Sequence, residues 1–148
     1  MTAIARMPLE NSAAKAQAAI REEFSYFSDW SERYQYLIDL GRKLAPLADA
    51  ERNDANRLLG CQSMVWITAS GNADALTFHA ASDSAIVSGL IYLALRVYSG
   101  RSAQEILATT PSYIADIGLA QHLSPTRNTG LAALLAFIQQ RAAQALAR

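Results

Sequence analysis

The chain contains one cysteine, Cys61, in the segment LLGCQSMVWI at residues 58–67. A thiolate is a strong nucleophile toward sulfur and also a metal ligand. Gly60 before it and the polar pair Gln62 and Ser63 after it are typical of a turn, which can present a side chain to another molecule. Cys61 is therefore the first candidate for chemistry. The plainer alternative is a small buried hydrophobic residue, because free cysteines are among the most buried residue types.

A single cysteine restricts the chemistry. A thiol peroxidase or redox sensor needs a second thiol to resolve its sulfenic acid. An iron–sulfur scaffold holds its cluster with several cysteines, and the two histidines here, His79 and His122, are far apart in the sequence. A helical interaction domain with an incidental cysteine remains a further alternative.

Composition predicts a soluble, cytoplasmic protein. Thirteen basic and thirteen acidic residues are scattered along the chain, so neither nucleic acid nor an anionic membrane is expected as a partner. The longest apolar run, AIVSGLIYLAL, is interrupted by Ser88 and Gly89 and is too short to span a bilayer. With 148 residues, of which 51% are hydrophobic, we expect one domain over residues 1–148, with residues 1–12 as a loose N-terminal extension.

The elements that position Cys61 can be predicted from periodicity and capping signals. Apolar spacing predicts helices over residues 13–27 and 30–44, the second opened by the capping box Asp29–Glu32. Residues 57–59 read as a short edge strand. Residues 63–69 and 75–80 are predicted to form an antiparallel hairpin around the turn signal SGNAD.

The second half of the chain is predicted to be helical. Ser82 and Asp83 are good N-cap types for a long apolar helix that ends near Gly100, and Ser102 with Glu105 forms another capping box. A short helical piece lies between Pro111 and Gly118, and Ser124–Pro125 opens the last helix. Because the strands are consecutive, the fold class is α+β, with a small antiparallel sheet of about three strands covered by helices.

Four segments, GCQSMVW, SDSAIVSGL, YSGRSAQEI and HLSPTRNTGL, resemble the SufE family of sulfur-acceptor proteins in their order and spacing. The upstream segment WSERYQYLIDLGRKL is similar to the second helix of that family. The resemblance covers residues 37–131 and implies a fold like those of SufE and the IscU-type scaffolds.

The resemblance also implies a function. A SufE-like protein takes a persulfide sulfur from a SufS-type cysteine desulfurase onto the residue that corresponds to Cys61. It stimulates the desulfurase and delivers the sulfur to a SufBCD-type iron–sulfur scaffold. Such a protein is a relay rather than an enzyme, and it needs no cofactor or metal of its own, because the pyridoxal phosphate belongs to the desulfurase. CsdE-like relatives, which serve a different desulfurase, are an alternative within the same resemblance.

Beside Cys61, the resemblance suggests five supporting residues. Arg127, at a predicted helix start, is a candidate either to lower the pKa of the thiol or to contact a partner. Asp83 corresponds to an acidic position near the cysteine loop, with N-capping as its structural alternative. His122 matches a family motif but is equally well explained as a structural histidine. Gln62 and Ser63 directly follow the cysteine.

Overall fold

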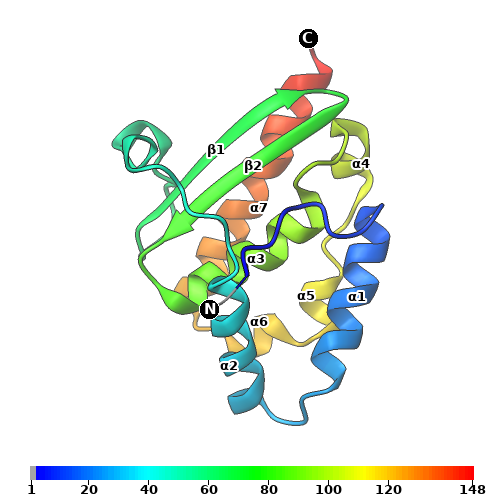
Figure 1. Cartoon of the computed structure of the whole chain (residues 1–148), viewed down its shortest axis with the longest axis vertical. Coiled ribbons are helices and arrows are strands. Elements are labelled where there is room, and N and C mark those ends of the chain that lie inside the picture. The colour runs from blue at the N-terminus through cyan, green and yellow to red at the C-terminus, as the bar shows by residue number, and fades with distance from the viewer. Residues whose placement is uncertain (1–2) are drawn as a thin grey trace.

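The computed structural model describes residues 3–148 and has the predicted α+β architecture. Helix α3 lies at the centre and contacts the hairpin and helices α1, α2 and α7 (Figure 1). The elements are α1 Ala13–Ser25, α2 Trp30–Gly41, β1 Val65–Asn72, β2 Ala75–Ser82, α3 Ala85–Tyr98, α4 Ala103–Ala108, α5 Tyr113–Asp116, α6 Leu119–His122 and α7 Pro125–Leu146. Two short 3-10 turns, Asp49–Glu51 and Asp54–Asn56, precede β1.

The predicted hairpin is confirmed. Strand β1 pairs with β2 in antiparallel register, from Val65 opposite Ser82 to Asn72 opposite Ala75. Val65 and Ile67 are buried in alternation with less buried neighbours, as expected for a strand that packs one face on helices.

The predicted third strand is wrong for the described chain, since residues 57–59 contribute only one bridge, between Arg57 and Trp66. The physical reason is local. A 3-10 turn capped by Asn53 ends just before this segment, and Gly60, with φ of 92°, turns the chain just after it. Too few extended residues remain between these two turns to form a ladder.

Helix α3 is the central core element, as expected from its apolar sequence, and all its residues from Gly89 to Tyr98 are buried. The glycine allows close contact with α2, because a Cβ at Gly89 would overlap the carbonyl oxygen of Leu37. The helix begins one residue later than expected. Its N-cap is Ser84, whose hydroxyl accepts a hydrogen bond from the Val87 N–H, so neither Ser82 nor Asp83 caps it.

The other predicted N-caps are confirmed, but the capping boxes are only half formed, because the Glu32 carboxylate accepts from the Ser28 hydroxyl and the Glu105 carboxylate from the Ala13 N–H. The side chain of Asp29 accepts from the Glu32 N–H, that of Ser102 from the Glu105 N–H, and that of Ser124 from the Arg127 N–H. These bonds satisfy backbone donors that have no partner within their own helix. They fix where α2, α4 and α7 begin, and the start of α7 proves important for the cysteine loop.

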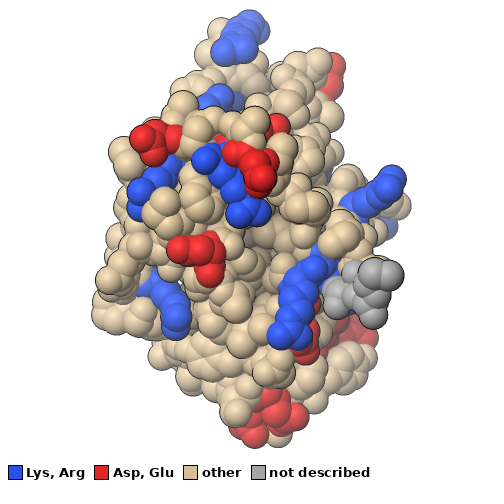
Figure 2. Space-filling model, turned by 60° about the vertical axis from the view of Figure 1, so that its left-hand side comes forward, with Lys and Arg blue, Asp and Glu red and all other residues tan. Residues whose placement is uncertain are grey.

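On the face of the molecule shown in Figure 2, basic and acidic side chains are interspersed and separated by wide areas without charge. Among residues 3–148, no helix is long and apolar enough to cross a membrane.

The N-terminal segment was expected to be loose, but from Ala5 onward it is held by specific contacts. The Ala5 N–H donates to the Lys43 carbonyl, and the Arg101 guanidinium donates to the Glu10 carbonyl. The carboxylate of Glu10 forms an ion pair with Arg96. The first two residues of the expected extension lie outside the described part of the chain.

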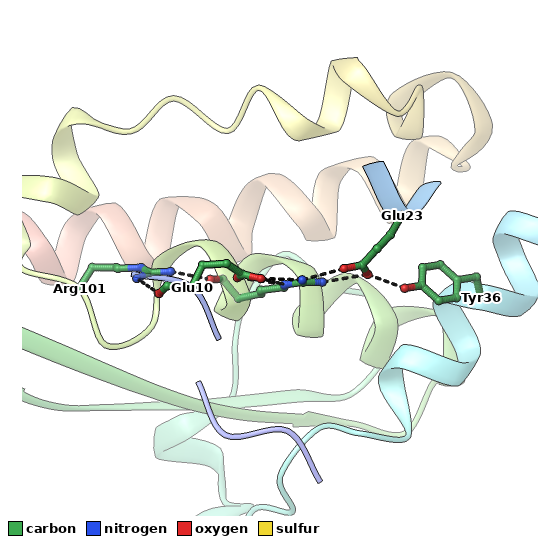
Figure 3. A network of polar contacts seen from close by, with 5 residues as sticks. Glu10, Glu23, Tyr36 and Arg101 are labelled. Atoms are coloured by element: carbon green, nitrogen blue, oxygen red, sulfur yellow. Dashed lines mark hydrogen bonds and ion pairs between the residues drawn. The ribbon is translucent and has the colours of Figure 1, made fainter. Parts of the chain in front are cut away.

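Arg96 is only 5% exposed and joins three parts of the chain. One of its nitrogens lies 2.7 Å from a carboxylate oxygen of Glu10 and 2.7 Å from one of Glu23 on α1. Tyr36 on α2 donates its hydroxyl to Glu23, which extends the network (Figure 3). The sequence did not predict this network, because Glu10 and Arg96 are 86 positions apart and no local pattern indicates that they pair.

Candidate functional site

Cys61 lies in a loop that is pinned at both ends. At one end the Leu58 N–H donates to the Val65 carbonyl at 2.9 Å. At the other end the Met64 N–H donates to a carboxylate oxygen of Asp83 at 3.1 Å, and the Asp83 N–H donates back to the Met64 carbonyl. The reciprocal pair ties the end of the loop to the start of α3. Cys61 itself sits between these pins, next to the turn at Gly60.

The Cys61 side chain is half-buried and points at helix α7. Its thiol lies 3.6 Å from the carbonyl oxygen of Gly130, within range of a weak S–H donor. A Cβ at position 130 would lie 3.2 Å from the sulfur, so the absence of a side chain there makes room for the thiol. Ser124 and Pro125 set the start of α7 and thereby place Gly130 opposite the loop.

The thiol opens onto a cavity of about 440 Å³. The apolar half of its lining comes from the loop, β1, α3 and α7: Leu58, Val65, Val87, Leu90, Ile91, Leu131 and Leu134. Polar groups line the rest of it: Gln62, Ser63, Ser124, Thr126, Arg127 and the backbone of Gly130. Segments that are more than sixty residues apart in the sequence thus enclose one site.

Burial raises the pKa of the Cys61 thiol, because the charged thiolate is disfavoured away from water. This differs from one of the two roles considered for Arg127, which was to lower the pKa of the thiol, and leaves its other role, contact with a partner, as a prediction. Arg127 does line the same cavity, but in this conformation its charge does not offset the effect of burial. Burial therefore favours the protonated form of the resting thiol, which is less nucleophilic and less readily oxidised than the thiolate.

The remaining candidates divide into two groups. Gln62 and Ser63 line the cavity with Cys61, and Asp83 holds the end of the loop. His122 lies elsewhere: its ring stacks on Trp30 with centroids 4.1 Å apart, and Nδ1 is 3.0 Å from the Gly118 carbonyl oxygen. The structure therefore supports the alternative that His122 is a structural residue.

Sequence reasoning missed Gly130 as the contact of the thiol and missed the apolar wall from α3. Both had a signal in the sequence. Gly130 and Leu131 end the segment HLSPTRNTGL, and Val87 and Leu90 lie within SDSAIVSGL. Within residues 3–148, no group of three or more His, Cys, Asp or Glu side chains is placed to hold a metal ion.

Comparisons with known proteins cover most of the chain. A family model described as "SufE: Fe-S metabolism associated domain" matches residues 18–142. Among solved structures, the chain is similar to a hypothetical protein from Thermus thermophilus whose solution structure is known. The two share 21% sequence identity with a TM-score of 0.72, over 90% of this chain and 97% of the other, which shows a common fold.

Proposed function

Because this chain belongs to the SufE family, whose domain is associated with iron–sulfur metabolism, we propose that it is a sulfur carrier. It accepts the outer sulfur of a cysteine desulfurase persulfide on Cys61 and delivers that sulfur for iron–sulfur cluster assembly. The observation that carries the proposal is the position of its only cysteine. Cys61 lies in a pinned loop, with its sulfur at an apolar cavity large enough to shelter a persulfide.

The transfer needs a single cysteine on each protein. The Cys61 thiolate attacks the outer sulfur of the donor persulfide, forming a new S–S bond while the S–S bond of the donor breaks. The donor cysteine leaves as a thiolate, and Cys61 carries the sulfur as a persulfide. The proton lost from Cys61 is available to the departing thiolate or to water. This transfer exchanges one S–S bond for another with no net oxidation, so it requires no external oxidant.

The protonated, half-buried resting state fits a carrier that acts only when a partner is present. Burial keeps the thiol unreactive in the free protein. Docking that draws the loop outward removes this effect and returns the pKa of the thiol toward its ordinary value. Arg127, at the edge of the cavity, then contacts the partner or the exposed sulfur. Gln62 and Ser63 would accompany the moving thiol.

The partners follow from the chemistry. We propose a SufS-type cysteine desulfurase as the donor, which carries the pyridoxal phosphate, and a SufBCD-type scaffold as the recipient, both in the cytoplasm. Removing the persulfide frees the donor cysteine for the next cycle, which accounts for stimulation of the desulfurase. The protein is then a relay partner rather than an enzyme with a small-molecule substrate. A CsdE-like role with another desulfurase uses the same site and differs only in the partner.

Mass spectrometry tests the proposal directly. The protein is mixed with a SufS-type desulfurase and free cysteine without reductant, and its peptides are measured. An added sulfur confined to the Cys61 peptide is expected, with Cys61→Ser as a matched variant that folds but takes up none. If Cys61 remains unmodified with every active desulfurase tested, of SufS and CsdE-partner type, the carrier function is wrong.

A further inference from the structure

Leu59 is 83% exposed, more than any other large hydrophobic side chain in residues 3–148. It lies two positions before Cys61 in the same pinned loop, and its neighbour Leu58 is buried. A single exposed leucine on a protein surface is ordinary. The position of Leu59 is unusual, because the cavity with its apolar wall lies on the other side of the same loop.

Leu59 and Cys61 face opposite ways across Gly60. The leucine faces solvent, while the cysteine faces Gly130 and the cavity. Gly60 has φ of 92° and can change its backbone conformation more freely than a residue with a side chain. Since the loop is held at Leu58 and Met64, a rotation of the part between these pins that brings Cys61 out carries Leu59 inward.

The cavity has room for a leucine side chain. A cavity of about 150 Å³ lined by leucine, isoleucine and phenylalanine is enough to hold benzene, and the one here measures about 440 Å³. This space is present with the thiol in place, and departure of the thiol would enlarge it and expose more of the wall formed by α3 and α7, which is unfavourable. An incoming leucine would cover that wall and would itself leave water.

We propose that Leu59 is a positioning residue for Cys61. When the loop turns the thiol outward, Leu59 takes its place in the cavity, so that the closed and open loops bury comparable apolar surface. The functional role given to this exchange rests on the proposed function, in which Cys61 accepts sulfur. The exchange itself is a property of the free protein and needs no partner.

Alkylation of Cys61 by iodoacetamide measures the open loop without a desulfurase. When opening is fast compared with alkylation, the rate constant is proportional to the open population. We expect Leu59→Ser to slow alkylation roughly tenfold or more, since the open loop then buries no leucine. Leu59→Met, which keeps an apolar side chain of similar size, should react at nearly the wild-type rate. Each rate is divided by that of the same variant in denaturant.

Thermal unfolding serves as the control, because an exposed side chain contributes little to the closed fold and the variants should melt close to wild type. If Cys61 of Leu59→Ser is alkylated as fast as in wild type or faster, the proposed exchange is wrong. It is also wrong if Cys61 of Leu59→Met is alkylated as slowly as in Leu59→Ser. If Leu59→Ser loses only desulfurase-dependent sulfur uptake while its alkylation rate is unchanged, Leu59 is a partner contact and the exchange is wrong. Failure of the carrier function would be seen separately, as wild-type Cys61 that takes up no sulfur.

Discussion

At the scale of single residues, the chemistry of this protein depends on how tightly one thiol is held. Cys61 has three restraints: the Gly130 carbonyl near its sulfur, the apolar cavity around it, and Asp83 at the end of its loop. Each of these can be changed without removing the thiol. They therefore predict graded effects on reactivity rather than simple loss.

The pH dependence of Cys61 alkylation follows from its burial. Because burial raises the pKa of the thiol, the folded protein holds its proton to a higher pH than the unfolded chain does. The alkylation rate of the folded protein should therefore rise to its plateau at higher pH than that of the same protein in denaturant. Rates measured across the alkaline range decide this, and coincident profiles would show that the thiol is already exposed at rest.

Asp83→Ala should loosen the loop. The substitution leaves the Met64 N–H without its charged acceptor and removes a hydrogen bond that contributes roughly 0.5–1.5 kcal/mol at this exposed position. We expect a lower stability in urea unfolding and faster alkylation of Cys61. Ser84→Ala is the matched control, because it removes the N-cap of α3, at a cost of about 1 kcal/mol, without touching the Met64 contact. Equal alkylation rates for the two variants would contradict the role given to Asp83.

At the scale of elements, Gly89 and Gly130 both lie in helices but make room for different groups, backbone at Gly89 and the Cys61 sulfur at Gly130. Substitution of each by alanine should therefore have different effects. At Gly89 the new methyl would overlap the Leu37 carbonyl oxygen, and since backbone cannot yield easily, α2 and α3 must move apart. We expect a loss of stability of about 1–3 kcal/mol, as for other overpacked sites. Urea unfolding measures it, and a variant as stable as wild type would show that the two helices are not packed this closely.

Gly130→Ala makes the same substitution in α7 but meets a movable group, the Cys61 sulfur, at 3.2 Å. Alanine favours a helix over glycine by about 1 kcal/mol, so stability should be kept or raised. The displaced thiol should react faster with iodoacetamide than in wild type. Unchanged reactivity would mean that the thiol does not rest against α7.

At the scale of the whole molecule, the buried Arg96 network ties the N-terminal segment to α1, α2 and α3. Arg96→Met should cost about 3–5 kcal/mol, because it leaves two carboxylates near the core without their cation. Neutralising these acids as well, with Glu10→Gln and Glu23→Gln, should recover part of the loss. Denaturant unfolding of the single and triple variants provides the comparison; additive losses would show that the three residues do not interact.

Acid should weaken the same network. Burial alone would raise the pKa of Glu23, but the hydrogen bonds from Arg96 and Tyr36 and the charges of Arg96 and Lys43 outweigh it, and the net pKa is lowered. A carboxylate with a lowered pKa contributes stability above its ordinary value of 4.5, and this contribution is lost as the pH falls through the folded pKa. Wild type should thus lose more stability below about pH 4.5 than Glu23→Gln does, as urea unfolding at several pH values would show.

Some features of this protein were readable from the sequence by itself because their causes are local. The caps at Asp29, Ser102 and Ser124, the hairpin and the α+β order each depend on residues a few positions apart. The candidate cysteine and the family resemblance also came from short segments. Two of the errors had local causes as well: the cap lies at Ser84 rather than at Asp83, and the short strand is reduced to a single bridge at Arg57.

Only the tertiary structure decided what surrounds the thiol. The loop of Cys61, the wall of α3 and the Gly130 carbonyl are separated by long stretches of chain, and no local rule indicates that packing brings them together. The same holds for Arg96, which binds the segment around Glu10. The direction of the pKa shift at Cys61 also depends on the tertiary structure. The sequence suggested Arg127 as a candidate to lower this pKa, but burial raises it, and burial depends on every element that packs around the sulfur.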